Sequence, residues 1–513
     1  MDNKKVLLRI SNLKQYFPLK KKGLFVKAND GISIDIYEGE TFGLVGESGC
    51  GKSTLGRTLL QLYPQTDGRT MYYGRTLDEI APDYVIKTIR GLEGKRHRLT
   101  ELDKKRDTLQ KEYDELKTEQ EKYLAKNDLD KAIKDSNDAF LDMTNIVGGF
   151  IIVEDLNPIM TIFEKEYRLF SKLRDKDSVR KEISLDYDDA KFMLDKANGN
   201  GENASKVKVK FEKEAARINT IDAEIAEIKK EIEGVKAEID KMREPYKNNS
   251  EFQKLEAYRD DGIDLARLLY KEMRLLRSDM QLIFQDPYSS LNPRMSVGQI
   301  VGEGMIAHKY FKRNGERMQE AILDVMNNCG LAPYFIHRFP HQFSGGQRQR
   351  IGIARSLAVQ PKFIVCDEAV SALDVSIQSQ IINLLQDLKE DKHLTYMFIT
   401  HDLSVVKYIS DRIGVMYLGT IVELANADEM FHNPLHPYTE ALLSAIPTTD
   451  VDSHRELVLL EGDIPSPVNP PKGCKFHTRC KYCTEICTHV IPDWQEIKPN
   501  HFVACHHMLP LKD

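Results

Sequence analysis

The spacing of apolar residues changes along the chain, and each change marks a different kind of element. Over residues 31–48, apolar and polar positions first alternate and then merge into a continuous apolar run, the pattern of a buried strand entering a glycine-rich turn. Residues 52–63 follow as a helix with leucines near one face. Residues 363–366 are again apolar and predict a second buried strand. Together these elements predict an α/β core.

A different spacing begins near residue 85, where apolar residues recur in alternating steps of three and four. The later stripe is unbroken and consists of Ile218, Ile221, Ile225, Ile228, Ile232, Val235, Ile239 and Met242. The earlier stripe is broken at Arg106 and Gln120. It consists of Leu92, Leu99, Leu102, Leu109, Tyr113, Leu116 and Tyr123. Lysine and glutamate fill the positions between, so both stripes predict coiled-coil helices.

We expect the two striped helices to pair with each other as one inserted antiparallel hairpin over residues 85–267, with about 130–210 as a small tip. A single charged helix that packs on nothing is the alternative. The hairpin is favoured because a lone helix with an exposed isoleucine stripe is poorly soluble.

Length and charge narrow the class of protein. A chain of 513 residues is too long for one compact core, which predicts two or three folding units. The net charge of -6 argues against a general nucleic-acid binder. The sequence contains no run of eighteen apolar residues and no apolar signal-peptide core, so we expect a cytoplasmic protein that reaches membranes only through partners.

The glycine-rich turn at residues 46–54 fits the pattern G-x-x-x-x-G-K-[ST] between a predicted strand and a predicted helix. Its small residues let backbone N–H groups close around phosphates at the start of a helix. Lys52 reaches the β- and γ-phosphates of such a nucleotide, and the Ser53 hydroxyl is a ligand for Mg²⁺. The candidate nucleotide-binding residues are Gly46, Glu47, Ser48, Gly49, Cys50, Gly51, Lys52, Ser53 and Thr54.

Two acidic residues, Asp367 and Glu368, end the second apolar strand. In parallel α/β sheets the carboxyl ends of strands are where ligands bind. Asp367 can hold Mg²⁺ through water, and Glu368 can orient or deprotonate the water that attacks the γ-phosphate.

Ser344, Gly345 and Gly346 precede another predicted helix and offer a second set of backbone donors for an anion. One γ-phosphate needs only one such loop. The second helix start therefore predicts a contact with the ATP of a facing subunit.

Along the chain the phosphate loop is followed by Gln285, "FSGGQ", "DEAVSALD" and His401 in "FITHD", and this order resembles that of the ATP-binding subunits of ABC transporters. The resemblance implies a RecA-like cassette with antiparallel β and helical subdomains. It also implies that Gln285 touches Mg²⁺ and that His401 contacts the γ-phosphate. Asp374 would lie at the dimer interface beside the signature that ends in Gln347. An aromatic residue stacks on adenine in this family, and Phe17 is a better candidate than Tyr16. Ala369 stands where proline is common.

The segments "IFQDPYSSLNPRM" and "NPLHPYTEALLSAIP" narrow the resemblance to the oligopeptide/dipeptide importer family, F-type subunit. It implies cassette parts at residues 1–84 and 268–448 and a Cys-rich domain at 449–513. The expected partners are a second homologous cassette, two permease subunits and, indirectly, a peptide-binding protein. The chain would be an ATPase coupled to transport at the cytoplasmic side of the membrane.

Five of the eight cysteines lie between residues 474 and 505, and in a reducing compartment such a cluster suggests a metal more than disulfides. Within the importer family, Cys474, Cys480, Cys487 and Cys505 match the cysteine spacing, which implies a [4Fe–4S] cluster. Zinc and simple reduced thiols are the alternatives. Cys483 is an additional residue that can compete as a ligand.

A chromosome-maintenance ATPase of the SMC/Rad50 class also carries an antiparallel coiled coil between its nucleotide motifs. Three features argue against it. The insertion precedes Gln285, whereas the coil follows the glutamine loop in that class. The stripes are short, and the C-terminal segments resemble importers. A tandem cassette of the translation-associated kind is excluded because the chain has only one phosphate loop and one signature.

Overall fold

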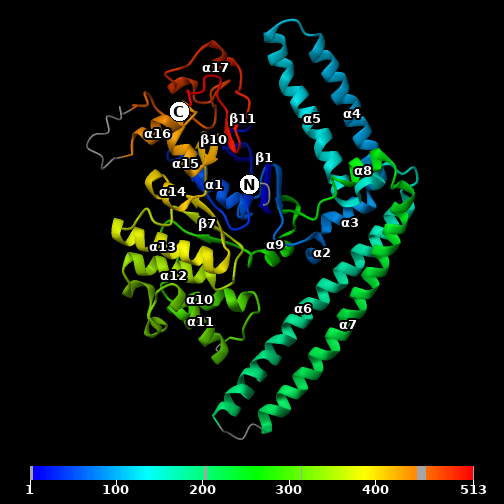
Figure 1. Cartoon of the computed structure of the whole chain (residues 1–513), viewed down its shortest axis with the longest axis vertical. Helices are drawn as coiled ribbons and strands as arrows, with labels where there is room; N and C mark the ends of the chain where they lie inside the picture. The colour runs from blue at the N-terminus through cyan, green and yellow to red at the C-terminus, as the bar shows by residue number, and fades with distance from the viewer. Residues whose placement is uncertain (1–3, 201–204, 314, 447–457, 512–513) are drawn as a thin grey trace. The chain divides into compact units, whose positions relative to one another are not determined.

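The computed structural model describes residues 4–200, 205–313, 315–446 and 458–511. It divides into two compact units, shown in Figure 1. The sheet unit comprises residues 1–74, 264–266 and 273–513, and the helical unit comprises residues 75–263 and 267–272. The helical unit therefore begins ten residues before the expected start at residue 85. The expected boundary between residues 448 and 449 lies outside the described residues.

The larger sheet of the sheet unit has eight strands in the order β11-β12-β10-β9-β3-β8-β7-β6. The strands β6, β7, β8, β3 and β9 run parallel to their neighbours, whereas β10, β12 and β11 are antiparallel. Both predicted apolar strands are central and fully buried. The bounds are β3 Thr41–Val45, β6 Met280–Ile283, β7 Phe363–Asp367, β8 Thr395–Ile399, β9 Arg412–Tyr417, β10 Thr420–Asn426, β11 Gln495–Lys498 and β12 His501–Val503.

A second, antiparallel sheet has the order β2-β1-β4-β5. It consists of β1 Val6–Pro18, β2 Phe25–Tyr37, β4 Asp67–Tyr72 and the short β5 Ile263–Asp264. Because β4 and β5 are neighbours, the chain leaves this sheet and returns to it at adjacent strands.

The helices of the sheet unit surround the larger sheet or form the helical part of the cassette. A buried apolar core joins α10, α11 and α12 to strands β6, β7 and β8. The bounds are α1 Lys52–Leu59, α9 Tyr270–Leu276, α10 Val297–Ala307, α11 Glu316–Asn328, α12 Gly345–Leu357, α13 Val375–Lys392, α14 Leu403–Ile409, α15 Ala427–His432, α16 Pro437–Ser444 and α17 Glu485–His489. Among the described helices, none combines the length and apolar composition needed to cross a membrane.

The described part of the cysteine-rich end, residues 458–511, belongs to the sheet unit, and a Cys-rich domain at residues 449–513 stays a prediction. Its strand β12 pairs with β10, with Glu423 opposite Val503 and Leu424 opposite Phe502. The strand β11 then extends the sheet edge beyond β12. Backbone pairing thus makes the described part of this segment continuous with the larger sheet.

The helical unit contains α2 Leu77–Ile80, α3 Asp83–Arg90, α4 Leu92–Glu115, α5 Glu119–Val147, α6 Asn157–Gly199, α7 Ser205–Arg243 and α8 Ser250–Glu256. A compact apolar hub holds these helices together at one end. Phe150 lies at its centre, with ring centroids 5.9 Å from Phe163 and 5.3 Å from Phe252. The hub also buries Leu92 from α4 and Ile239 from α7.

The helices pair differently from the expectation of one hairpin. In Figure 1, α4 lies beside α5, and α6 lies beside α7. The second pair is antiparallel, because Lys165 meets Glu238 at 3.1 Å near one end and Lys176 meets Glu224 further along. The region expected as a tip, about 130–210, supplies most of α5 and all of α6 as partner helices. The prediction that the two striped helices pair with each other is wrong, because each striped helix pairs with a helix adjacent to it in the sequence.

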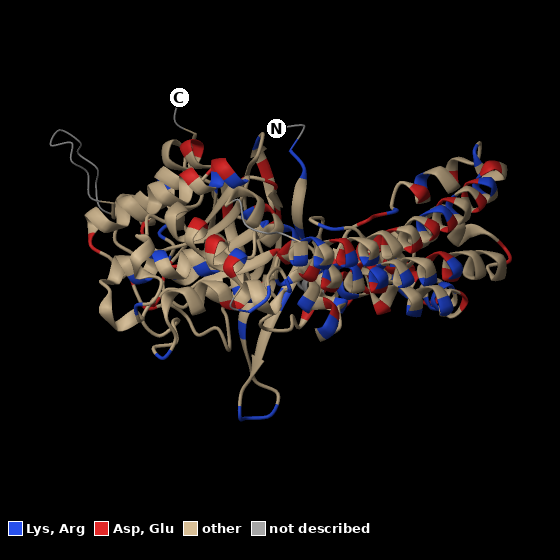
Figure 2. Ribbon diagram, turned by 90° about the horizontal axis from the view of Figure 1, so that it is seen from below, with Lys and Arg blue, Asp and Glu red and all other residues tan. Residues whose placement is uncertain are grey.

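The two stripes differ in burial. All seven residues from Ile218 to Ile239 in the later stripe are buried against α6 and the hub. Among the residues of the earlier stripe whose side chains are described, Leu92 is buried, and the others, Leu99, Leu102, Leu109, Tyr113 and Leu116, are half-buried. Arg106 breaks that stripe because its Nη1 donates to the buried Ser136 Oγ on α5 at 3.1 Å. Figure 2 shows Lys and Arg interspersed with Asp and Glu along these helices.

Candidate nucleotide site

The phosphate loop joins β3 to α1 and depends on glycine at two positions. Gly51, the N-cap of α1, has φ of 104°, and a Cβ there would lie 2.1 Å from the Ala28 carbonyl oxygen. Gly46 has φ of 150°, and its Cβ would lie 2.2 Å from the Met416 carbonyl oxygen. Only glycine accepts both the backbone conformation and the close approach. The sequence therefore folds this loop against neighbouring backbone and leaves its other side open.

Lys52 is the buried cation of the loop. Its Nζ donates to the carbonyl oxygens of Gly46 at 2.7 Å and Glu47 at 3.0 Å, and it lies 3.7 Å from the Cys50 sulfur. Burial raises the pKa of the Cys50 thiol, which keeps this sulfur protonated beside the ammonium group. Lys52 is thus held at the loop as a fixed positive charge.

The predicted Mg²⁺ ligands converge at the end of β7. The Ser53 hydroxyl donates to Asp367 Oδ1 at 2.5 Å. Arg57 Nη2 donates to Asp367 Oδ2 at 3.1 Å. A hydroxyl and a carboxylate at contact distance supply the oxygen ligands that Mg²⁺ requires, and Gln285 adds an amide oxygen nearby in the same pocket.

Two further predicted residues approach the Glu368 carboxylate. Gln285 Nε2 donates to Glu368 Oε2 at 2.6 Å, and His401 Nδ1 lies 3.5 Å from Glu368 Oε1. The backbone of Glu368 has φ of 48°, a conformation that costs free energy and often marks a functional position. Residues that follow β6, β7 and β8 therefore meet at one carboxylate.

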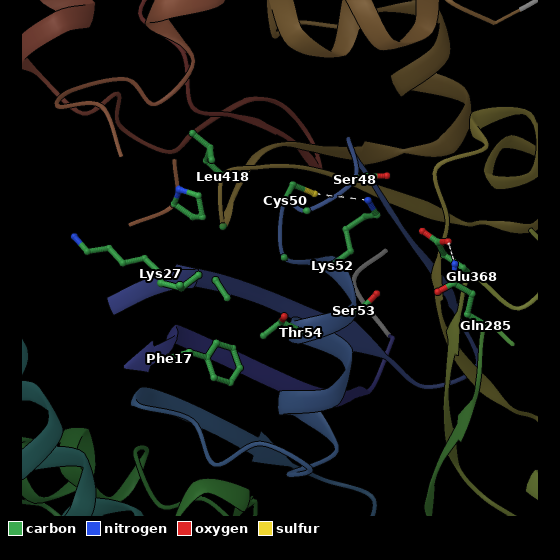
Figure 3. Close-up of a pocket in the computed structure, with 16 residues that line it drawn as sticks. Phe17, Lys27, Ser48, Cys50, Lys52, Ser53, Thr54, Gln285, Glu368 and Leu418 are labelled. Carbon is green, nitrogen blue, oxygen red and sulfur yellow. Dashed lines mark hydrogen bonds between the residues drawn. The ribbon is translucent and has the colours of Figure 1, made fainter. Parts of the chain in front are cut away.

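Lys52, Ser53, Gln285 and Glu368 line a pocket of about 460 Å³. Figure 3 shows Phe17 and Lys27 on one side and Gln285 and Glu368 on the other. Phe17 packs edge-on against Tyr63, with centroids 5.3 Å apart. Tyr16 instead donates its hydroxyl to Asp30. Phe17 thus lines the pocket, as expected of the residue that stacks on adenine, and its role stays a prediction.

The signature residues lie apart from this pocket. Ser344 caps α12 in a reciprocal arrangement with Gln347, whose backbone N–H donates to the Ser344 hydroxyl at 3.4 Å. Gly345 and Gly346 open the same helix, and Asp374 is the N-cap of α13. These five residues are absent from the described lining of the pocket. That these residues contact the ATP of a facing subunit stays a prediction.

Sequence reasoning missed residues that support the loop from the C-terminal segment. Pro467 lines the pocket, Tyr438 accepts a hydrogen bond from the Glu47 N–H at 2.9 Å, and Arg479 pairs with the Glu47 side chain. Arg479 lies among the cysteines, where the sequence pattern drew attention only to metal binding. Arg57 was also missed, although its place one helical turn after Ser53 puts it on the same face of α1.

Two of the four family cysteines are joined through the backbone, because the Cys474 N–H donates to the Cys487 carbonyl oxygen at 2.9 Å. Burial and then the neighbouring Cys474, Cys480 and Cys487 raise the pKa of the Cys505 thiol to about 12. Burial, with Cys487 and Cys480 nearby, raises the pKa of Cys474 to about 11. Cys483 is exposed, and its N–H donates to the Cys480 carbonyl oxygen at 3.2 Å. No cysteine forms a disulfide.

The strand order, the phosphate loop and the acidic end of β7 define an ATP-binding cassette. Comparison with known proteins agrees. The ABC transporter family model matches residues 29–148 and 238–371. The model for the oligopeptide/dipeptide transporter C-terminal region matches residues 422–487.

Curated relatives extend this result. The chain is 51% identical over 250 residues to the oligopeptide transport ATP-binding protein AppF of Bacillus subtilis, covering 48% of this chain and 75% of the relative. It is 51% identical over 252 residues to OppF of Salmonella typhimurium, covering 49% and 75%. A putative peptide import ATP-binding protein of Brucella ovis is 52% identical over 245 residues, covering 48% and 77%. The chain therefore belongs to the family of oligopeptide transport ATP-binding proteins.

Among solved structures, the bacterial ABC transporter cassette MJ0796 matches with a TM-score of 0.42 at 15% identity, covering 82% of this chain and 99% of that chain. The predicted family is confirmed by the curated relatives. The chromosome-maintenance alternative receives no support from them.

Proposed function

We propose that this chain is the ATP-hydrolysing subunit that energises import of oligopeptides or dipeptides through an ABC transporter complex. The observation that carries the proposal is the convergence of Gln285 and His401 on Glu368, beside a complete phosphate loop. The match of residues 422–487 to the oligopeptide/dipeptide transporter C-terminal region directs the proposal toward peptides.

In the proposed reaction, Glu368 orients a water molecule toward the γ-phosphorus and accepts its proton as the bond to ADP breaks. Gln285 and His401 hold the two carboxylate oxygens of Glu368 from opposite elements. Lys52 stabilises negative charge on the β- and γ-phosphates. Mg²⁺, held by Ser53, Asp367 and Gln285, would neutralise further phosphate charge when bound.

The signature residues support a second cassette as partner. Ser344, Gly346 and Asp374 do not line this chain's own pocket, so they are free to complete the site of a facing subunit. We propose a heterodimer with a homologous ATP-binding subunit, seated on two permease subunits at the cytoplasmic face of the membrane and served by a peptide-binding protein. Chemical crosslinking of Asp374→Cys to the phosphate loop of each candidate partner would identify the pairing.

The cysteine cluster is proposed to hold a [4Fe–4S] cluster. The proposal is supported by the sequence spacing of Cys474, Cys480, Cys487 and Cys505, four thiols of the kind that ligate such clusters. Among the described residues, no group of three His, Cys, Asp or Glu side chains is arranged to hold a metal ion. Iron, zinc and sulfide analysis with an absorbance spectrum tests this, and zinc alone would contradict it.

The helix pair α6–α7 is proposed to be a short antiparallel coiled coil. Its seam repeats in steps of three and four and is buried, and Lys165–Glu238 and Lys176–Glu224 flank it.

The proposed transport function is tested by purification of the tagged chain from detergent extracts. We expect polytopic membrane subunits to co-purify and peptide-loaded binding protein to stimulate ATP hydrolysis. Hydrolysis stimulated by DNA, with no membrane subunit retained, would contradict the proposal.

A further inference from the structure

The phosphate loop has an attachment outside the cassette motifs. Arg479 Nη1 donates to Glu47 Oε2 at 2.7 Å, and Nη2 donates to Oε1 at 3.1 Å. The Arg479 side chain is 6% exposed and that of Glu47 is 26% exposed. A bidentate pair of this kind is both strong and geometrically specific. It fixes the second residue of the loop from a segment more than four hundred residues away in sequence.

The Glu47 backbone is held from both directions. Its N–H donates to the buried Tyr438 hydroxyl at 2.9 Å, and its carbonyl oxygen accepts from Lys52 Nζ at 3.0 Å. A displacement of Glu47 therefore moves a direct contact of the cation that serves the phosphates. The side chain of Glu47 does not line the nucleotide pocket, so its effect on ATP acts through the loop.

The anchor of Arg479 is rigid. Phe476, three residues earlier, packs between Tyr417 and Tyr438, with ring centroids 5.2 and 5.4 Å away. The intervening residues His477–Arg479 form a single 3-10 turn. Packing of this density leaves the guanidinium few alternative positions.

The same turn is bracketed by two of the clustered cysteines. Cys474 and Cys480 flank it in sequence, the Cys474 carbonyl oxygen accepts from the His477 N–H at 3.1 Å, and the Cys474 N–H donates to Cys487 at 2.9 Å. These backbone hydrogen bonds hold the start of the turn that carries Arg479.

We propose that Arg479 is a positioning residue that sets the phosphate loop through Glu47 and thereby adjusts the affinity for ATP.

The first arm of the test is a double-mutant cycle on the full-length chain. Arg479→Ala and Glu47→Ala are each expected to weaken binding of a fluorescent ATP analogue about tenfold, and the double variant is expected to bind no more weakly than either. In transporter assembled with each variant, the loss should appear in KM with kcat largely retained. Lys481→Ala is the matched control, because Lys481 pairs with Glu440 from the same segment at 3.2 Å.

Affinities within twofold of wild type for both single variants, additive losses, or an equal loss in Lys481→Ala would overturn the positioning role. Thermal unfolding of each variant shows whether it is folded. Arg479→Lys keeps the positive charge but lacks the paired guanidinium donors, so it should lose less affinity than Arg479→Ala. It provides a second, folded variant for the comparison.

The second arm of the test compares Arg479→Lys with Arg479→Ala in the same binding assay. Equal losses of affinity in the two folded variants would overturn the role of the bidentate contact.

Discussion

The nucleotide site and the α7 seam bury different kinds of residue, and the difference separates chemistry from scaffold. In the sheet unit, Lys52 and Asp367 are 5% and 1% exposed, yet both are charged groups of the nucleotide site. In the helical unit, the buried stripe of α7 is almost entirely isoleucine. Nucleotide motifs occur on both sides of the inserted chain, and the described insertion supplies none of the residues that line the pocket. An insertion can therefore lengthen the sequence between motifs without changing the site they form.

The largest expected effect is on ATP hydrolysis at the nucleotide site of the sheet unit. Glu368→Gln removes the carboxylate that accepts the proton but keeps an oxygen for Gln285, so hydrolysis should fall about 10³-fold while ATP binding persists. Phosphate release by the assembled transporter and nucleotide affinity measure the two properties. Glu390→Gln on the exposed face of α13 serves as control and should leave both unchanged. Normal turnover in Glu368→Gln would remove Glu368 from the catalytic role.

The next effect should be confined to the helical unit. Ile228 is buried in the α6–α7 seam, so Ile228→Ala leaves a cavity and should lower the free energy of unfolding of this unit by about 3 kcal/mol. Chemical denaturation followed by far-ultraviolet circular dichroism, which reports helix content, measures this free energy. Glu227→Ala, one residue earlier and exposed, should change it by less than about 0.5 kcal/mol. Equal losses in both variants would mean that the seam is not packed as described.

A smaller effect concerns pH and the sheet unit alone. Burial lowers the pKa of His436 to about 3, below its value of 6.5 in the unfolded chain. Between these values the unfolded state binds the extra proton, so stability is present at neutral pH and is lost as pH falls below about 6.5. At pH 5 the loss attributable to His436 should be about 2 kcal/mol.

The matched variant for this prediction is His436→Asn. His436 Nδ1 accepts from the Tyr438 N–H at 3.0 Å at the start of α16, and asparagine can accept the same hydrogen bond without titrating. Melting temperatures of wild type should fall more steeply between pH 7 and pH 5 than those of the variant. Parallel pH profiles would show that His436 is not buried in its neutral form.

The smallest effect is expected from the largest change. Replacement of residues 75–262 by a short Gly/Ser linker rejoins β4 to its neighbour β5 and should leave ATP-analogue affinity within twofold of wild type. Equilibrium titration measures it. A large loss of affinity in a folded deletion variant would show that the helical unit contributes to the site.

The sequence predicted the site better than it predicted the insertion. The phosphate loop and the acidic end of β7 have local patterns with direct structural meaning, and Gln285 and His401 follow from the family order. The heptads of α7 correctly predicted which residues are buried, because periodicity specifies a face. They could not specify the partner helix, since α6 has a weaker pattern and pairs through proximity in sequence.

The C-terminal segment was harder to predict for a different reason. The strand β12 has only three residues, too few for a recognisable alternation, so its pairing with β10 depends on tertiary context. The Arg479–Glu47 contact likewise has no local signal, because an isolated arginine among cysteines does not indicate its distant partner.

The adjacency of β4 and β5 has a consequence for how the chain folds during synthesis. These neighbouring strands are separated by about 190 residues of sequence, and closing a flexible loop of that length costs about 3 kcal/mol more than closing a five-residue turn. The contacts of α4 with α5 and of α6 with α7 are local and form quickly. An insertion that folds first brings its own ends together, so the late-arriving strands β6 to β9 meet a sheet whose long loop is already closed.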